Sequence, residues 1–203
     1  MEVCCLPPDP HRRNPHSYAA ILDATFDQLS SVGYNKLTIE RVAAQAGVGK
    51  ATVYRWWPKK SRLVVEAMTE RYQFPPVVSS GDLRSEVRDL VRRAIDFMVH
   101  TPMGYALPQL AADLDDDPEA KALLIDWLGP NRAAHLAVLY GAAGRSDLPH
   151  DVDADLLLDV IAGTILYRNL LGQKPDERLV DQLTSLIVDC TLPRSGHSDG
   201  RLV

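Results

Sequence analysis

The 203-residue chain has only three cysteines, Cys4, Cys5 and Cys190. Small secreted domains use several cysteine pairs as a framework, so three cysteines, two of them adjacent, exclude this class. The chain also lacks the C-x-x-C pairs and Cys/His clusters that hold zinc, and we expect no metal or other cofactor. We interpret Cys190 as a packing residue on a helix. Cys4–Cys5 is interpreted as a feature of the tail, and a redox- or metal-responsive tail is the alternative.

Long apolar runs are absent as well. No stretch is long and apolar enough to cross a membrane, and Pro7, Pro8 and Pro10 interrupt the region where a signal peptide needs its apolar core. We therefore expect a cytoplasmic protein. The hydrophobic share of 46% is nevertheless enough to form a core. Strand-like runs and internal repeats are also missing, which favours an all-α fold.

The sequence shows no signature of catalysis. It has no paired acid and base, no nucleophile elbow and no phosphate-binding loop. His100, His135 and His150 lie in different segments, and each is interpreted as structural. The run Asp115–Asp117 lacks the alternating oxygen ligands of a calcium loop, so we interpret it as a turn followed by a helix cap. We expect that the protein is not an enzyme; an enzyme on an all-helical fold is an alternative that only the isolated histidines support.

The charge is unevenly distributed along the chain. The net charge of −5 argues against a protein that binds nucleic acid over its whole surface. Residues 11–62, however, contain nine lysines and arginines against three acids, while the rest of the chain is acidic. A basic head joined to an acidic body is expected if only the head meets phosphates.

Residues 37–57, LTIERVAAQAGVGKATVYRWW, have the pattern of two short helices joined by a tight turn. Thr38 is suited to cap the first helix, and Gly47 is suited to the left-handed turn that ends it. The second helix begins at Lys50 and places Val53 and Trp57 on its inward face, four residues apart. This pattern predicts a helix-turn-helix, whose second helix enters the major groove of DNA. The apolar positions of the first helix are Ile39, Val42, Ala43 and Ala46.

The outward residues of the second helix carry charges and hydrogen-bonding groups. Such groups contact phosphates and base edges in protein–DNA complexes. The alternative is a pair of packed helices whose polar face is only solvated. The outward residues are Lys50, Thr52, Tyr54 and Arg55.

A longer pattern surrounds this motif, from about Arg12 to Tyr72. Its residues are Ile21–Phe26, Gly33–Tyr34, Leu37–Ile39, Val42–Ala43, Ala46–Val48, Thr52–Lys60 and Leu63. In residue type and in spacing, the pattern resembles the DNA-binding domain of the TetR family of bacterial transcriptional regulators. The resemblance implies a three-helix DNA-binding head, followed by a larger helical domain that dimerises and usually binds an inducer.

The resemblance also implies roles for single residues. Lys60 matches the lysine that commonly contacts a phosphate at the start of the fourth helix, and Thr38 is expected to hold the DNA backbone. The chain departs from the family pattern at Gly49 and Lys59, where Ser is common, and at Trp56–Trp57, where a His-Phe pair is common. These departures concern the phosphate contacts rather than the fold. The residues expected at the DNA are Thr38, Lys50, Ala51, Thr52, Tyr54, Arg55, Trp56 and Lys60.

We expect an all-α protein of about nine helices in two domains. Residues 14–73 are expected to form the helix-turn-helix DNA-binding domain, and residues 79–193 the helical effector-binding and dimerisation domain. Residues 1–13 and 194–203 are expected to be a disordered arm and tail; alternatively, Arg12–Arg13 in the arm reaches the DNA. The expected helices span about residues 14–32, 38–46, 50–57, 59–72, 82–101, 103–114, 117–140 with a kink at Gly129–Pro130, 153–171 and 176–190.

The segment 156–171 is apolar on nearly all sides, which predicts a helix that is buried on two sides. One side can face its own domain and the other needs a partner, and Ala162–Gly163 would allow another helix to approach closely. We expect the last two helices of two copies to pair into a four-helix bundle. The resemblance points to the same homodimer, and a wholly internal helix is the alternative.

Methionine and aromatic residues of the larger domain are candidates for an effector pocket, because such side chains line apolar sites with few polar anchors. They are equally ordinary core residues. Arg168 is the one cation in the apolar segment, and a buried arginine needs an acidic partner or an anionic ligand. A structural ion pair, a surface position and an effector counter-charge all remain open for it. The candidates are Met98, Met103, Tyr105, Trp127, His135, Tyr140, Tyr167 and Arg168.

Together these features predict a homodimeric transcriptional regulator that binds a palindromic operator in double-stranded DNA. In the simplest form of this hypothesis the protein is a repressor, and an unidentified small-molecule effector releases it from DNA. The alternative is a helical ligand-binding or scaffold protein whose helix-turn-helix does not read DNA.

Overall fold

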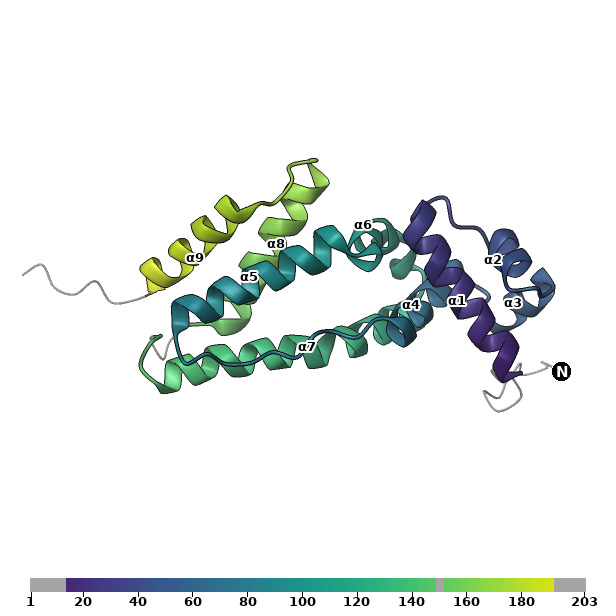
Figure 1. Ribbon diagram of the computed structural model, residues 1–203. Coiled ribbons are helices and arrows are strands. Elements are labelled where there is room, and N and C mark those ends of the chain that lie inside the picture. The colour runs from purple at the N-terminus through teal and green to yellow at the C-terminus, as the bar shows by residue number, and fades with distance from the viewer. Residues whose placement is uncertain (1–13, 149–151, 192–203) are drawn as a thin grey trace, which may run out of the picture. The chain divides into compact units, whose positions relative to one another are not determined.

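The computed structural model describes residues 14–148 and 152–191 (Figure 1). Within these ranges the chain forms nine helices and no strand, which confirms the all-α prediction. The expected arm and tail, with Cys4–Cys5, lie outside the described residues, as do His150 and the side chain of Cys190. The helices are α1 (Pro15–Val32), α2 (Ile39–Gln45), α3 (Lys50–Trp56), α4 (Lys60–Arg71), α5 (Leu83–His100), α6 (Pro102–Asp115), α7 (Pro118–Gly144), α8 (Ala154–Leu170) and α9 (Glu177–Thr191).

The helices belong to two compact units. The first unit comprises the chain up to Pro75 together with His100–Gly129, so α1 to α4 share it with α6 and the first part of α7. The second unit comprises Pro76–Val99 and the chain from Pro130 onward, with α5, the rest of α7, α8 and α9. The division falls inside α7 before Pro130, whose ring nitrogen has no hydrogen to donate within the helix.

Local sequence signals set the ends of the first helices. The Asn14 side chain accepts a hydrogen bond from the His16 amide at 3.0 Å, and Pro15 occupies the first turn of α1. Gly33 follows α1 with a φ of 78°, a left-handed conformation that glycine adopts without a Cβ clash. Thr38 caps α2 by accepting from the Arg41 amide at 3.4 Å. The cap at Thr38 confirms the one that the sequence predicts.

The helix-turn-helix of α2 and α3 is closed by one glycine turn. Gly47 has a φ of 68°, and the amide of the next residue, Val48, donates to the carbonyl of Ala43 at 3.0 Å. Val53 and Trp57 are buried on the inward side of α3, as their spacing predicts. The outward face of α3 is therefore fixed relative to α2.

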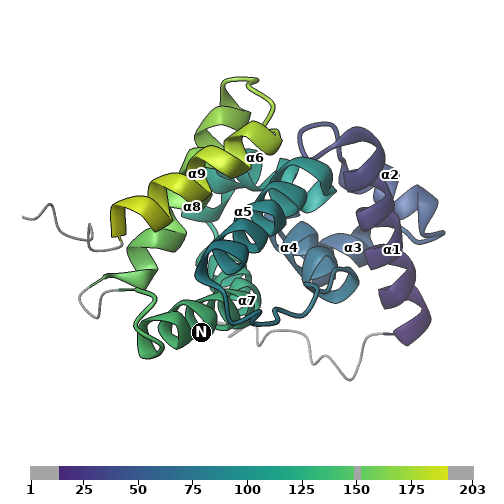
Figure 2. The same ribbon diagram turned by 60° about the vertical axis from the view of Figure 1, so that its left-hand side comes forward.

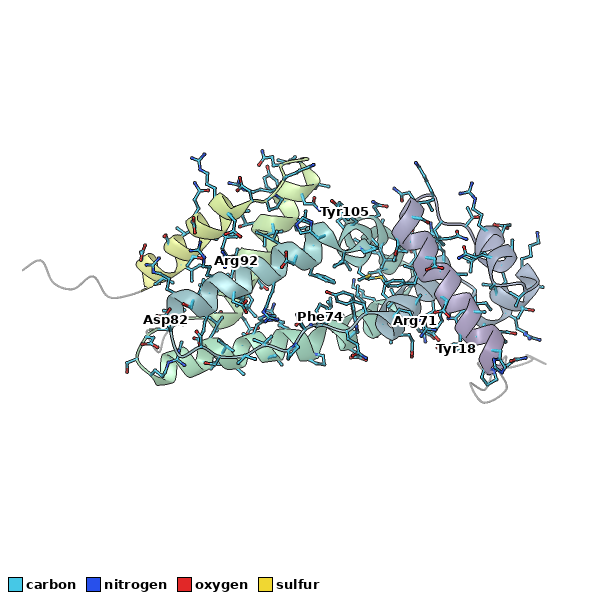
Figure 3. The ribbon with its side chains drawn as sticks, viewed as in Figure 1. Tyr18, Arg71, Phe74, Asp82, Arg92 and Tyr105 are labelled. Carbon is cyan, nitrogen blue, oxygen red and sulfur yellow. The ribbon has the colours of Figure 1, made fainter. Side chains whose placement is uncertain are left out.

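A partly buried polar junction ties α1, α3 and α4 together. The Tyr18 ring stacks on the Trp57 ring, with 5.6 Å between the ring centroids. Both side chains donate hydrogen bonds to the carboxylate of Glu66, at 2.6 Å from the Tyr18 hydroxyl and 2.7 Å from the Trp57 indole. At the far end of α4, Arg71 pairs with Asp23 of α1 at 2.6 Å (Figure 3).

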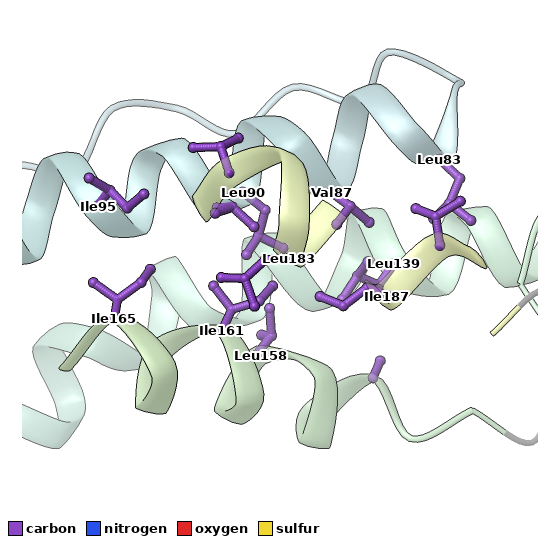
Figure 4. Close-up of a cluster of buried hydrophobic side chains, with 14 of the residues drawn as sticks. Leu83, Val87, Leu90, Ile95, Leu139, Leu158, Ile161, Ile165, Leu183 and Ile187 are labelled. Carbon is purple, nitrogen blue, oxygen red and sulfur yellow. The ribbon is translucent and has the colours of Figure 1, made fainter. Parts of the chain in front are cut away.

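The second unit is built around an aliphatic cluster that α5, α7, α8 and α9 share (Figure 4). α5, α8 and α9 lie side by side in both ribbon views (Figure 1 and Figure 2). On the outside of this cluster, Arg84, Arg88 and Arg92 of α5 pair with acids of α9, and the pair of Arg92 with Glu177 spans 2.8 Å. The labelled core residues are Leu83, Val87, Leu90, Ile95, Leu139, Leu158, Ile161, Ile165, Leu183 and Ile187.

Candidate nucleic-acid interface and effector residues

Four of the expected DNA contacts lie on the exposed face of α3. Lys50, Ala51 and Arg55 are exposed, and the Tyr54 side chain is 46% exposed although its ring is large and apolar. Thr52 is half-buried beside them. A helix of this length spans about 10 Å, so these side chains can meet only a few consecutive base pairs.

Trp56 is a correction to the expected set. Its side chain is only 7% exposed, and its ring meets the Trp57 ring edge-on at 5.7 Å between centroids. The ring therefore belongs to the core of the first unit, where it cannot reach a base. The guanidinium of Arg55 lies 5.9 Å from the Trp56 ring centroid, so Trp56 instead supports a neighbour on the exposed face.

Thr38 and Lys60, the two expected backbone contacts, are both engaged within the protein. Thr38 is exposed, and as the cap of α2 its hydroxyl accepts a hydrogen bond but keeps its own proton to donate. Lys60 is half-buried at the first position of α4. Its Nζ donates to the Tyr34 carbonyl at 3.3 Å and lies 4.0 Å from the centroid of the Tyr34 ring.

Tyr34 joins this end of α4 to α6. Its side chain is buried and its hydroxyl donates a short hydrogen bond to the carboxylate of Asp113. Burial, followed by the hydrogen bond and the negative charge of Asp113, raises the pKa of the Tyr34 phenol well above its usual value. Tyr34 thus remains a neutral donor at any physiological pH. The sequence pattern marks Tyr34 only as part of the resemblance and gives no signal of its partner.

The eight candidate effector residues are divided between the two units. Met103, Tyr105 and Trp127 belong to the first unit, and the other five belong to the second. Met103 is buried, whereas Tyr105, Tyr140 and Tyr167 are each more than half exposed (Figure 3 labels Tyr105).

Trp127 packs into an aromatic group that the sequence does not reveal. Its ring lies 4.9 Å from the Phe74 ring and 6.1 Å from the Tyr72 ring, measured between centroids (Figure 3 labels Phe74). The indole N–H donates to the Tyr72 carbonyl at 3.4 Å. Tyr72 and Phe74 follow α4 in a stretch that reads as a domain boundary, so only the fold shows that they contact α7.

His135 presents an unused acceptor inside the second unit. Its Nδ1 lies 2.9 Å from the Asn131 carbonyl, an acceptor, so Nδ1 carries the proton. Burial lowers the pKa of the His135 imidazole and keeps it neutral. Nε2 is buried and has no hydrogen-bond partner among the described residues, so it offers a free lone pair.

Arg168 is half-buried in the last turn of α8. Within residues 14–148 and 152–191 no acid lies within ion-pair distance of its guanidinium, so a structural pair of that kind is not formed there. The same ranges contain no group of three or more His, Cys, Asp or Glu side chains placed to hold a metal ion. No helix of the described chain has the length and apolarity that a bilayer crossing needs.

Two family matches cover most of the chain. Residues 21–67 match the bacterial regulatory proteins of the tetR family, and residues 77–187 match the Tetracyclin repressor-like C-terminal domain. The first match ends at residue 67 and the second begins at residue 77.

Whole-chain relatives carry related descriptions. The uncharacterized HTH-type transcriptional regulator Rv1556 of Mycobacterium tuberculosis is 28% identical over 98% of this chain and 97% of its own length. The DNA-binding transcriptional repressor TetR of Mycobacteroides abscessus is 27% identical over 84% of this chain and 93% of its own. These relatives are regulators rather than enzymes.

Solved structures have the same fold. The TetR family transcription regulator SCO0332 is 29% identical, covers 88% of this chain and 100% of its own, and superposes with a TM-score of 0.64. FadR from Bacillus subtilis, solved in complex with stearoyl-CoA, is 15% identical over 84% of this chain and 97% of its own, with a TM-score of 0.55, and shares the fold. The chain belongs to the TetR family of HTH-type transcriptional regulators.

Proposed function

We propose that the protein is a transcriptional repressor that binds a near-palindromic operator as a homodimer in the cytoplasm and is released by a small-molecule effector. The observation that carries this proposal is the exposed polar face of α3, held by a buried core on a basic head. The Mycobacteroides abscessus relative is described as a repressor, which supports repression rather than activation.

The proposed DNA contacts follow from exposure. Lys50, Ala51, Thr52, Tyr54 and Arg55 meet base edges and phosphates of one major groove. Thr38 and Lys60 hold the backbone on either side, and α4 begins without a side-chain cap, so its first amides are open to an oxygen ligand. In a symmetric dimer two such faces lie about 34–36 Å apart, one turn of DNA, which requires a palindromic site.

The exposed apolar side of α8 supports a dimer through α8 and α9. Leu156, Val160, Gly163, Tyr167 and Leu170 recur every three or four residues and are all exposed, so they form one continuous face. Tyr167 is 63% exposed and Leu170 is 70% exposed. A second copy of α8 would cover this face, and a Cβ added at Gly163 meets nothing within 4 Å in the single chain.

The effector proposal rests on His135. A neutral imidazole with a free Nε2 accepts hydrogen bonds, so the effector should carry a hydroxyl or N–H donor rather than a carboxylate at this point. Met98 packs on the core of the same unit and supplies apolar surface. Whatever its identity, the effector can release DNA only by binding the DNA-free state more tightly than the bound state.

The test is DNA binding by the intact protein and by Lys60→Ala. Fluorescence anisotropy on duplexes from the region upstream of the gene should show specific binding, weaker in Lys60→Ala for every sequence. The plot of log affinity against log salt should become shallower by about one unit, because one phosphate contact is lost.

The matched control is Lys174→Ala, an exposed lysine of the second unit between α8 and α9. It should bind like the unchanged protein. An unaltered salt slope in Lys60→Ala would remove that residue from the interface, and absence of any salt-sensitive duplex binding would favour the ligand-binding or scaffold alternative.

A further inference from the structure

We propose that the turn between α6 and α7 competes with DNA phosphate for the cations at the start of α4. This turn and the adjoining ends of the two helices, residues 113–119, are called the acidic corner. It lies in the same compact unit as the helix-turn-helix. The inference rests on the proposed DNA-binding function and adds an internal competitor that sets the affinity.

Three neighbouring residues at the start of α4 are bound directly by the acidic corner. The Lys59 ammonium donates a short hydrogen bond to the Asp116 carbonyl. The Ser61 hydroxyl donates to the Asp117 carboxylate at 2.6 Å, and Arg62 donates to the Glu119 carboxylate at 2.8 Å. These three contacts fix the first turn of α4 rather than one side chain.

Lys60 is held by the same corner through Tyr34. Its ammonium contacts the Tyr34 carbonyl and ring, and the Tyr34 hydroxyl is bound in turn by the Asp113 carboxylate. Beside this contact the Asn35 amide donates to the Gln109 side chain of α6 at 3.3 Å. The lysine proposed to meet a phosphate is therefore held against Tyr34, whose hydroxyl is bound to α6.

Asp117 makes the corner rigid. One of its carboxylate oxygens accepts from Ser61, and the other accepts from the Ala120 amide at 3.2 Å and so caps α7. The residue is buried. Because one carboxylate serves both helices, the corner cannot move away from α4 without losing either the hydrogen bond from Ser61 or the cap of α7.

The charges make this contact a competition. The acidic corner carries five carboxylates within seven residues, and the start of α4 carries Lys59, Lys60 and Arg62. Phosphates that approach α4 meet cations that the acids already partly neutralise. These phosphates also lie within about one Debye length of the acids. When a cation of α4 moves from a carboxylate to a phosphate, that carboxylate takes up a counterion from solution. This uptake offsets part of the counterion release that drives DNA binding.

The test removes charge and keeps shape. Asp113→Asn and Glu119→Gln retain oxygen acceptors for Tyr34 and Arg62 but lose the negative charge. Each should tighten binding to the operator duplex by about two- to threefold, the range that exposed charge pairs contribute. The double variant should bind tighter still, with a steeper salt dependence than the unchanged protein.

Asp126→Asn is the matched control, since Asp126 is an exposed acid of α7 two helical turns beyond Glu119. It should leave the affinity within experimental error. Circular dichroism and thermal melting check that each variant is folded. The proposal is overturned if folded Asp113→Asn and Glu119→Gln bind with unchanged or lower affinity, because the corner would then only support the head.

Retention on immobilised heparin separates this proposal from the proposed function. Heparin is a polyanion without sequence, so both variants should elute at higher salt than the Asp126→Asn control even if no operator is bound. Unchanged elution would refute the competition. If the variants elute at higher salt but no form of the protein binds the duplex, the proposed regulator function is refuted and the competition is not.

Discussion

In the first unit polar side chains of different helices meet at a partly buried junction, whereas the second unit packs an aliphatic cluster, and its ion pairs in the described chain lie at the surface apart from the one at buried Glu86. Tyr18, Trp57 and Glu66 form this junction in the first unit. The second unit instead leaves a row of apolar side chains of α8 uncovered. Directional bonds therefore position the first unit, whereas the proposed dimer would cover the exposed apolar row of the second.

The largest expected effect is at the junction of the first unit. Trp57→Ala removes a fully buried ring and leaves the Glu66 carboxylate without its indole donor. We expect a loss of about 3–5 kcal/mol in the free energy of unfolding, and loss of DNA binding with it. Urea unfolding measures the first and anisotropy the second.

Tyr54→Ala is the companion variant, because Tyr54 is exposed on the same helix. It should change stability by less than about 0.5 kcal/mol while weakening DNA binding. If the two variants destabilise the protein equally, the junction does not hold α3.

The next effect concerns the uncovered face of the second unit. Gly163→Glu places a charge at the centre of the face formed by Leu156, Val160, Gly163, Tyr167 and Leu170. Sedimentation should show a monomer, because the carboxylate would be buried without a partner in the dimer.

The control is Gly144→Glu, at the exposed end of α7, where an added Cβ also meets nothing within 4 Å. This variant should remain dimeric. A dimer that persists in Gly163→Glu would place the interface elsewhere.

The smallest expected effect is at the one buried carboxylate that holds the start of α5. Glu86 accepts hydrogen bonds from Ser79, from the Gly81 amide at 3.0 Å and from Arg145 at 2.8 Å. Burial by itself would raise the pKa of the Glu86 carboxyl, but these donors outweigh it and lower the pKa below its ordinary value of 4.5. Glu86→Gln should cost about 1–3 kcal/mol at neutral pH.

The sign of the pH dependence follows from that lowered pKa. The stabilisation by Glu86 is fully present above pH 4.5 and is lost as the pH falls through the lower pKa of the folded state. The difference in unfolding free energy between Glu86→Gln and the unchanged protein should therefore shrink as the pH falls below 4.5 and through the lower pKa of the folded state. Asp126→Asn, at an exposed acid of α7, is the control. A pH-independent difference at Glu86 would contradict this account.

Features that depend on near neighbours in the chain can be predicted from the sequence. The cap at Asn14, the cap at Thr38 and the turns at Gly33 and Gly47 all involve residues within a few positions of each other, and the structure has each of them. The exposed face of α3 follows from the same helical spacing.

Features that depend on distant partners cannot be predicted in this way. Tyr34 meets Asp113 and Ser61 meets Asp117 across more than fifty residues, and no local pattern marks these pairs. Trp56 and Trp57 are adjacent and chemically identical, so only the packing of the first unit shows that both rings are buried. For the same reason the sequence cannot show whether the eight candidate effector residues form one site.

The placement of the tryptophans has a practical consequence. The chain has three tryptophans, Trp56, Trp57 and Trp127, and all belong to the first unit. Tryptophan fluorescence, excited where tyrosine does not absorb, therefore monitors the melting of that half alone, while far-ultraviolet dichroism averages over every helix. Two optical probes on the unlabelled protein can thus tell whether the halves melt together or one after the other.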